Sequence, residues 1–514
     1  MTPPRRERLL ARGLTTAAVT ASLLVLATYL VKAWALVEYP WDWSPDEGLQ
    51  LDWGRRAALG LRQLYGRSTV PFPAVYGPGL PLLLAPLAPL GPAMLQAARV
   101  LAVSWTALGA FAVFKLARPA AGRIGALVAV ALSLAAFDYS VWWMLVRPDG
   151  PMLALWLLAA ATLLPPRLAR GADTLAWRRI ALGSALILAA VVTKPTVVIY
   201  GAPLVVGWLA VDRRSALRLA LALAAAGVLL VLLLEWLTAG SFLWLTRAWA
   251  LQATQAGLAL VILEHAGASL WPLIAFAAAA LAVARKRRGE LLRDGSLLMV
   301  AGAALITPFL NKHGASWNYM LPLVPALSVL AVRWWALALA TRPRAGGLRL
   351  ALAAGALLAL ALARTHHFPL PSALDERTAR AFYRFVVEHT TRSGGPILAT
   401  RPELAYFLVG QSVEMEGASF APLARYRIPG PDLVLQRLLE RRYTLIVELH
   451  PLPEGGWAEA AAEGYRHAGG CNLSFYFGTT PVHLFTRRDL PLFMSPPAGT
   501  RCGGPAAGTA AAQP

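Results

Sequence analysis

The chain has 514 residues, of which 57% are hydrophobic and 15% are charged, and its formal net charge is +21. Soluble domains carry about 25% charged residues, so this composition excludes a wholly soluble protein. A mean hydropathy of +0.54 indicates that much of the chain lies in lipid. The positive residues stand between apolar runs instead of on one face, which favours membrane orientation over nucleic-acid binding. The two cysteines, Cys471 and Cys502, allow at most one disulfide, and the sequence does not decide whether they pair.

The first apolar run, 14–37, follows a basic segment and is longer than the core of a signal peptide. We predict that it is an uncleaved first span and that residues 1–13 are cytoplasmic. Since a spanning helix needs about 20 apolar residues, the runs that can cross a membrane with their flanks are 14–37, 95–117, 121–137, 150–164, 179–193, 195–211, 216–238, 269–284, 295–310, 318–340 and 349–364. A further run, 78–91, is short and rich in proline, and we expect it to be juxtamembrane or half-inserted.

Basic residues fix the predicted orientation. With the N-terminus inside, every inner loop is basic, as the positive-inside rule requires, whereas a crossing at 78–91 would place the basic loop 115–123 outside. The sequence therefore predicts a polytopic α-helical membrane protein with about eleven transmembrane helices, with its N-terminus inside and its C-terminus outside. Helical and strand-like stretches alternate over 365–494, which predicts an extracytoplasmic α/β domain, and the low-complexity tail 495–514 is expected to be disordered.

The outer loop 38–94 carries an Asp-Glu pair in "SPDEGLQLDWG". Ser44 or Pro45 can begin a helix, which places Asp46 and Glu47 in its first turn. Acids there favour helix initiation through the helix dipole, and this structural role is one explanation of the pair. A carboxylate at the membrane interface can also act as a general base towards a hydroxyl or amine, or bind a divalent cation.

Four segments together resemble a known family. The Asp-Glu pair is followed by "VYGPGLPLLLAPLAPLG", and then by "RPDGPMLALWLLAAATLL", "GSALILAAVVTKPTVVIYGAPLVV" and "NKHGASWNYMLPLVPALSVLA". Their order and placement resemble the GT-C glycosyltransferases, in particular the branch of protein O-mannosyltransferases and lipid A aminoarabinose transferases. Bacterial proteins described as dolichyl-phosphate-mannose-protein mannosyltransferase-like belong to this branch. The resemblance covers most of 10–340.

The resemblance implies a reaction and its acidic residues. The donor would be a sugar on a polyprenyl phosphate. Asp46 would deprotonate the acceptor, which attacks the anomeric carbon with inversion, and Glu47 would position the acceptor or support Asp46. Asp149 matches a second acidic site that holds a divalent ion or the acceptor in some members, although an Asp in a turn or helix cap is also common.

The donor phosphate requires cations. Lys194 interrupts an apolar run at "TKPT", and Lys312 lies in "NKHG"; both match basic positions of the family, although each could instead extend to the interface. Arg147 can bind phosphate oxygens bidentately. His313 and Tyr319 would line the same cleft, but Tyr319 could equally be an interfacial anchor.

These expectations combine into a transmembrane catalytic module over 14–364. It would be a hexosyl- or pentosyltransferase in the cytoplasmic (inner) membrane, acting at the outer face on a glycan, lipid or protein acceptor. A divalent metal ion at Asp149 is one alternative for that residue. No nucleotide cofactor is expected, because no phosphate-binding glycine loop is present, and three histidine-containing pairs, 366–367, 388–389 and 448–450, lack clean zinc spacing. The alternative functions are a lipid or glycan transporter (flippase) and a non-catalytic membrane scaffold.

Overall fold

The computed structural model describes residues 5–503, except for 42, 66–73, 75, 165–173, 251–253, 288, 290–293, 313–314, 340–345, 366–369, 395–396, 400–412, 416–430, 449–456, 476–477 and 491–499. The chain divides into two compact units. The helical unit comprises Met1–Trp34, Val100–Leu232 and Ala253–Phe368, and the mixed unit comprises Ala35–Arg99, Leu233–Gln252 and Pro369–Pro514.

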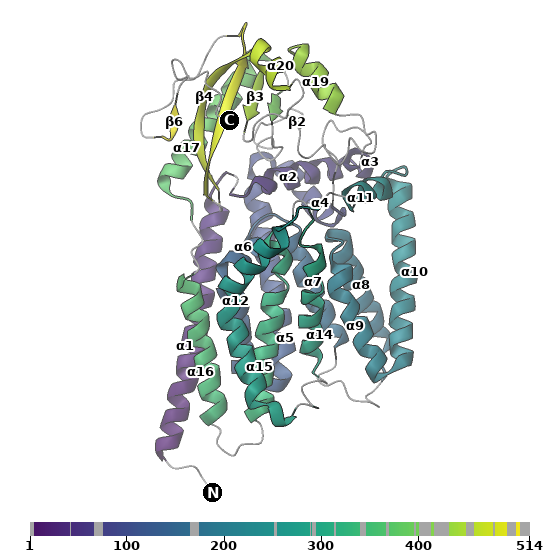
Figure 1. Cartoon of the computed structure of the whole chain (residues 1–514), viewed down its shortest axis with the longest axis vertical. Coiled ribbons are helices and arrows are strands. Elements are labelled where there is room, and N and C mark those ends of the chain that lie inside the picture. Colours follow the sequence, from purple (N-terminus) through teal and green to yellow (C-terminus); the bar gives the residue numbers. More distant parts are fainter. Residues whose placement is uncertain are drawn as a thin grey trace. The chain divides into compact units, whose positions relative to one another are not determined.

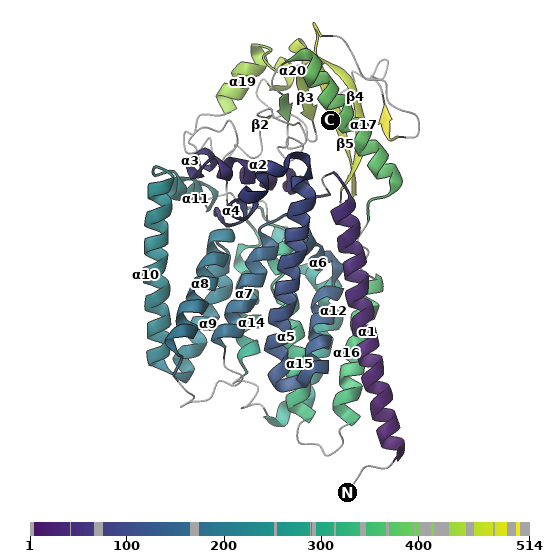
Figure 2. The same cartoon turned by 180° about the vertical axis from the view of Figure 1, so that it is seen from behind.

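The helical unit is built from long apolar helices (Figure 1). They are α1 (Arg5–Glu38), α5 (Met94–Ala135), α6 (Phe137–Met144), α7 (Asp149–Leu163), α8 (Trp177–Thr193), α9 (Val197–Val211), α10 (Arg213–Leu237), α12 (Leu258–Val283), α14 (Gly295–Ala304), α15 (Leu323–Leu339) and α16 (Gly346–Thr365), with short 3-10 turns η2 (Arg285–Arg287), η3 (Thr307–Phe309) and η4 (Trp317–Met320). The ends of α1, α5 and α10 extend into the mixed unit. Figures 1 and 2 show α7, α8, α9 and α14 side by side.

Burial separates central helices from peripheral ones in this unit. The apolar window of Trp317–Leu339 is 89% buried, whereas that of α10 is 11% buried. The exposed face of α10 carries large apolar side chains such as Leu221, Leu229 and Leu232. An apolar surface of this kind is stable in lipid but not in water, so this burial pattern agrees with a membrane location.

Glycine and proline interrupt the helices near positions where the sequence predicts breaks. Gly122 has φ +70°, which favours glycine, and it breaks α5 at the start of the predicted span 121–137. The helices α8 and α9 are separated at Lys194-Pro195, because proline cannot continue a helix at its interior. One prediction needs correction: α12 begins at Leu258, not at 269, because Glu264 and His265 interrupt the hydropathy but not the helix.

Each of the eleven predicted apolar runs falls on a helix, so the polytopic helical architecture is confirmed. Among the described residues, six helices are long and apolar enough to cross a membrane. The pair α6 and α7, bent by 100°, would make a seventh, and Val197–Leu209 and Gly295–Phe309 are apolar but shorter. Eleven crossings and their orientation remain predictions.

The mixed unit contains short helices and a six-stranded sheet. The helices are α2 (Pro45–Ala58), α3 (Leu61–Leu64), α4 (Gly79–Leu84), the 3-10 segment η1 (Ala85–Ala93), α11 (Phe242–Ala250), α17 (Ala373–Ser393), α19 (Pro431–Leu439) and α20 (Trp457–Gly464). The strands are β1 (Ile397–Ala399), β2 (Val413–Met415), β3 (Leu445–Glu448), β4 (Tyr465–Phe475), β5 (Gly478–Arg487) and β6 (Cys502–Gly503), in the order β2-β1-β3-β5-β4-β6. The strands β1, β2 and β3 are parallel, and the other pairs are antiparallel.

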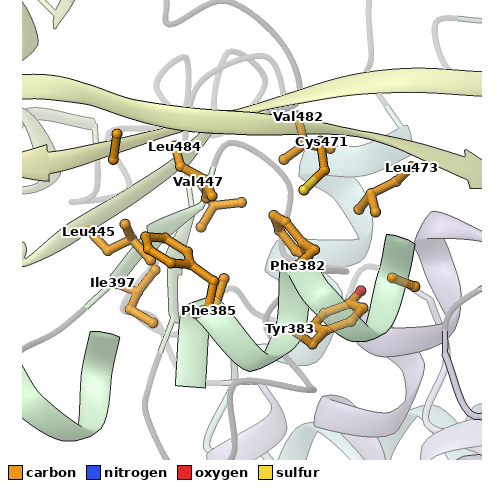
Figure 3. Packing of buried hydrophobic residues seen from close by; sticks show 13 residues of the cluster. Phe382, Tyr383, Phe385, Ile397, Leu445, Val447, Cys471, Leu473, Val482 and Leu484 are labelled. Atoms are coloured by element: carbon orange, nitrogen blue, oxygen red, sulfur yellow. The ribbon is translucent and has the colours of Figure 1, made fainter. Parts of the chain in front are cut away.

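Helix α17 covers one face of this sheet. Figure 3 shows Phe382 and Phe385 of α17 packed among side chains of β1, β3, β4 and β5, such as Val447 and Leu484. A second cluster, on the opposite faces of β1 and β3, contains residues of α19 and α20 and the buried Tyr443. Alternate residues of a strand point to opposite faces, so helices on both sides of the sheet account for the apolar runs of β1 and β3.

Cys471 and Cys502 form a disulfide that joins β4 to β6. The strand β6 therefore lies within the segment 495–514 that composition led us to expect as disordered; residues 504–514 lie outside the described part. Strand β4 was not expected from the sequence, because its centre contains Gly469-Gly470 and the ladder shifts register there. The position of this domain outside the membrane remains a prediction.

Candidate functional site

A buried carboxylate lies at the first residue of α7. The bend between α6 and α7 places Asp149 directly after Arg147-Pro148, and the Asp149 side chain is fully buried. An acid in the first turn interacts favourably with the helix dipole. Burial of a charged carboxylate is costly unless cations and hydrogen bonds compensate it, so its neighbours determine what this position can do.

Two segments distant in the sequence and the nearby residue Arg147 supply these neighbours. The Lys194 ammonium lies 2.6 Å from Asp149 Oδ1, and the Asn318 amide donates a hydrogen bond to the same oxygen at 3.1 Å. The guanidinium of Arg147 lies 3.5 Å from Asp149 Oδ2. Lys194 and Arg147 are themselves buried. Three residues that the sequence singled out for different roles, Asp149, Lys194 and Arg147, are therefore in direct contact in the structure, and their roles remain predictions.

The backbone break at Lys194 explains its position. The lysine caps the C-terminus of α8 in extended conformation, where a cation also suits the helix dipole. Its ammonium lies 5.0 Å from the Tyr319 ring, and Tyr200 donates a hydrogen bond to the Tyr319 carbonyl at 3.0 Å. The Arg147 guanidinium lies 4.4 Å from the Trp142 ring. Aromatic faces stabilise both cations without neutralising them.

The charge of this cluster is its main chemical property. Two cations, Lys194 and Arg147, contact one anion, Asp149. Such a cluster attracts an anion whose oxygens accept hydrogen bonds, and Arg and Lys are the side chains that bind phosphate. We refer to Arg147, Asp149, Lys194 and Asn318 as the cationic cluster.

The cationic cluster does not fit a divalent metal ion. Both oxygens of Asp149 already contact cations, and a metal ion beside Lys194 and Arg147 would be repelled. Among the described residues, no group of three or more His, Cys, Asp or Glu side chains could hold a metal. His389, one of the histidines considered from the sequence, is buried beside the Thr444 carbonyl; residues 366, 367 and 450 lie outside the described part.

Lys312 does not belong to this cluster. Its backbone pairs with Thr254 in an isolated antiparallel bridge, and its side chain is partly buried. No acidic side chain in the described part of the chain forms an ion pair with it. Burial lowers the pKa of the Lys312 ammonium. His313 lies outside the described residues.

The acidic loop begins a helix as expected. In the mixed unit, α2 starts at Pro45 with Ser44 as its N-cap. The Glu47 carboxylate accepts hydrogen bonds from the backbone N–H groups of Trp43 (3.0 Å) and Ser44 (3.2 Å). This is the reciprocal half of a capping box. Asp46 is the second residue of α2, and its side chain lies outside the described residues.

Arg99 holds Glu47 in place. Its guanidinium pairs bidentately with the carboxylate, with Nε at 3.0 Å from Oε1 and Nη2 at 2.7 Å from Oε2. The same guanidinium donates to the carbonyls of Leu36, Tyr39 and Trp41. Both side chains of the pair are fully buried. Glu47 therefore fixes the chain on either side of residue 42 and the backbone of the adjacent Asp46.

Sequence reasoning missed Arg99 and Asn318. Arg99 could have been noticed, because it lies inside the predicted span 95–117, where a charge needs a buried partner. Asn318 has no comparable signal, since its contact with Asp149 joins residues 169 positions apart.

The fold is similar to that of several solved structures. ArnT from Cupriavidus metallidurans bound to undecaprenyl phosphate has a TM-score of 0.55 and 15% sequence identity, covering 90% of this chain and 97% of that chain. The Archaeoglobus fulgidus oligosaccharyltransferase, in complex with Zn and sulfate, has a TM-score of 0.51 and 14% identity, covering 93% and 74%. No protein-family model and no curated protein sequence matches this chain. The chain therefore has the GT-C fold, as the resemblance of its sequence predicted.

Proposed function

We propose that this chain is an integral membrane glycosyltransferase that moves one sugar from a polyprenyl-phosphate donor to an acceptor at the outer face of the cytoplasmic membrane. The observation that carries the proposal is the buried cationic cluster, Arg147, Asp149, Lys194 and Asn318, in a chain with the GT-C fold. ArnT of this fold has been solved with undecaprenyl phosphate, which supports a polyprenyl-phosphate donor here.

The cationic cluster would bind the donor phosphate. Lys194 has three ammonium donors, of which Asp149 engages one, and Arg147 adds a planar guanidinium. When the bond between the anomeric carbon and the phosphate oxygen breaks, the electron pair goes to the phosphate. Fixed cations next to that oxygen stabilise the growing charge and lower the barrier. Asp149 and Asn318 would hold the Lys194 ammonium in position.

Asp46 would be the general base. It takes the proton of the acceptor hydroxyl or amine, whose oxygen or nitrogen forms the new bond to the anomeric carbon with inversion. Glu47 is fully paired with Arg99 and two backbone amides, so its role would be to fix the start of α2 and hence the Asp46 backbone. The cationic cluster requires no metal ion in this scheme. Lys312 and His313 would have their roles outside that cluster.

An assay with a panel of donors and acceptors would identify the sugar and the acceptor. A glycan, a lipid and a protein each offer a hydroxyl or amine that Asp46 could deprotonate. The donor sugar would be a hexose or a pentose. The six-stranded domain would help to select the acceptor, and its location would be extracytoplasmic.

The test compares Asp46→Asn with Asp52→Asn. Both variants remove one carboxylate from α2, but Asp52 is partly exposed and pairs with Arg56 at 3.0 Å. Purified proteins in lipid are given a panel of polyprenyl-phosphate sugars with native envelope extract, and free polyprenyl phosphate is measured. General-base catalysis contributes about 10²–10⁴-fold, so we expect Asp46→Asn to lose release by that factor and Asp52→Asn to retain it.

Each other outcome has a definite meaning. Equal release by wild type and Asp46→Asn would refute Asp46 as the base. If the wild type binds donors without releasing any polyprenyl phosphate, a lipid-flipping assay would then test the transporter alternative. Tolerance of combined changes at Asp46, Asp149 and Lys194 would favour a non-catalytic scaffold.

A further inference from the structure

A cavity of about 230 Å³ lies in the helical unit, at the end of α7 opposite to Asp149. It is lined by residues of α5, α8, α14 and α15 and of the C-terminal end of α7, among them Lys115, Ala161, Leu164, Arg179, Ser296 and Arg333. The helix α7 has 15 residues, which at 1.5 Å per residue separates its two ends by about 22 Å. The cavity is therefore distinct from the cationic cluster.

The floor of the cavity is buried and electrically balanced. Arg333 contacts both oxygens of Asp294 at 3.0–3.1 Å and donates to the Leu116 carbonyl at 2.8 Å. Asp294 also caps α14 by accepting from the Ser296 backbone N–H at 2.8 Å. This pair is a fixed structural element, and it leaves no net charge at the floor.

The rim of the cavity is cationic. Lys115 and Arg179 are both exposed, and none of the described residues that line the cavity is acidic. The Arg179 Nε donates to the Thr162 carbonyl at 2.8 Å, which directs the guanidinium to this site. Within the described part of the chain, no hydrogen bond or ion pair engages its two terminal nitrogens or the Lys115 ammonium. The rim thus presents a charge of +2 above an uncharged floor.

The size and lining of the cavity identify its occupant. A volume of about 230 Å³ is below the 300–1,000 Å³ of pockets that enclose a drug-sized ligand, so it suits a small headgroup and not a whole lipid. Apolar side chains such as Ala161 and Leu164 complete its wall. Basic pockets between transmembrane helices on the cytoplasmic side bind anionic headgroups. Lys115 on α5 and Arg179 on α8 belong to the basic residues that the charge pattern predicts to be on the cytoplasmic side.

We propose that this cavity binds the phosphate headgroup of an anionic phospholipid of the inner leaflet, with Lys115 and Arg179 contacting the phosphate oxygens. The inference does not depend on the sugar-transfer reaction, because none of these residues belongs to the cationic cluster or to α2. Free phosphate compounds share the same chemistry, and the experiment separates the two sources.

The test titrates full-length protein in non-ionic detergent with phosphatidylglycerol and follows binding by native mass spectrometry. Phosphatidylcholine, whose headgroup has no net charge, is the control lipid. The variant Lys115→Gln/Arg179→Gln should bind phosphatidylglycerol about 10–30-fold more weakly, since each cation near an anionic lipid contributes a factor of about five. The matched control Arg118→Gln/Arg178→Gln removes the same charge from exposed positions on the same helices that do not line the cavity, and should lose less than about threefold.

A second variant tests the cavity itself. Ala161→Trp places a large side chain in the cavity without changing its charge, and it should also abolish the preference for phosphatidylglycerol. Unchanged melting temperatures of the charge variants would show that these variants retain the fold. Equal losses in the two charge variants would overturn the proposal, because they would reveal diffuse electrostatic attraction. Displacement of the lipid by millimolar inorganic phosphate would assign the site to a soluble phosphate compound and overturn the lipid source.

Discussion

Removal of the Lys194 ammonium tests how the buried carboxylate of Asp149 is stabilised. At 2.6 Å and an effective dielectric constant of about 20, the attraction between the two charges is about 6 kcal/mol before desolvation is subtracted. In Lys194→Met, the remaining partners are Arg147 at 3.5 Å and Asn318 at 3.1 Å. Because breaking a buried pair on one side costs about 3–5 kcal/mol, we expect a loss of stability of that size.

A second substitution in the same background separates stability from donor binding. Asp149→Asn removes the uncompensated charge but keeps a side chain of the same shape, so Lys194→Met/Asp149→Asn should recover most of the lost stability. It should not recover donor binding or release of polyprenyl phosphate, because the ammonium is still absent. Thermal unfolding in detergent, followed by tryptophan fluorescence, measures the first quantity, and the release assay measures the second.

The control is Lys312→Met, which removes a partly buried lysine that has no acidic partner among the described residues. It should cost less than about 1 kcal/mol, since no buried charge is left unpaired. If the double variant is no more stable than Lys194→Met, Lys194 and Asp149 are not energetically coupled, and the reasoning is refuted. Recovery of both stability and activity in the double variant would show that Lys194 only neutralises Asp149.

Three further predictions concern the mixed unit. Arg99→Met removes the cation that pairs with the buried Glu47 carboxylate, so thermal unfolding should show a loss of about 3–5 kcal/mol. Loss of the Cys471–Cys502 disulfide, which closes a separation of 31 residues, should cost about 3–4 kcal/mol; dithiothreitol should destabilise wild type but not Cys502→Ser. Burial lowers the pKa of His389, so the unfolded chain is protonated first, and stability should fall as pH decreases below about 6.5. His389→Gln should flatten this pH dependence, and an unchanged slope would contradict it.

The helices could be predicted from sequence because lipid imposes a simple rule. A membrane helix must satisfy its own backbone hydrogen bonds and present apolar side chains, so hydropathy alone locates α8, α9 and α10. The break at Lys194-Pro195 was visible for the same reason, since proline and a charge together interrupt an apolar run. The start of α12 was placed eleven residues too late, because Glu264 and His265 lower the local hydropathy while remaining compatible with a helix.

The candidate site could be predicted only in part. Asp149, Arg147 and Lys194 attract attention as polar groups among apolar residues, and the family resemblance suggested their roles. Their mutual contacts depend on how α7, α8 and η4 pack, which no local pattern encodes. Asn318 was missed because an asparagine near a helix end has many local explanations, and only tertiary packing shows that it bonds to Asp149.

In the sheet too, some strands can be predicted from local sequence, whereas others depend on tertiary contacts. Strands β1 and β3 are short apolar runs bounded by turn residues, and the sequence predicts them. Strand β4 contains Gly469-Gly470 at a register shift, where glycine weakens the strand pattern but permits a bulge. Strand β6 is two residues long, and the pairing with β4 and the disulfide define it more than its own composition does.

Two buried ion clusters of this chain each pair a carboxylate with cations, but they differ in how many hydrogen-bond donors of the cations are engaged. The Arg99 guanidinium has five N–H donors, and all five are engaged by Glu47 and three backbone carbonyls, so this pair is neutral and saturated. An incoming phosphate would gain no cation there without breaking the pair. At Asp149, two cations share one carboxylate, and an ammonium with three donors gives only one of them to it. An anion that enters this cluster can accept hydrogen bonds from the other two ammonium donors of Lys194 while Asp149 stays paired. The engaged donors of Arg99 therefore favour a structural role for Glu47–Arg99, and the remaining donors of Lys194 favour a phosphate-binding role for the cationic cluster.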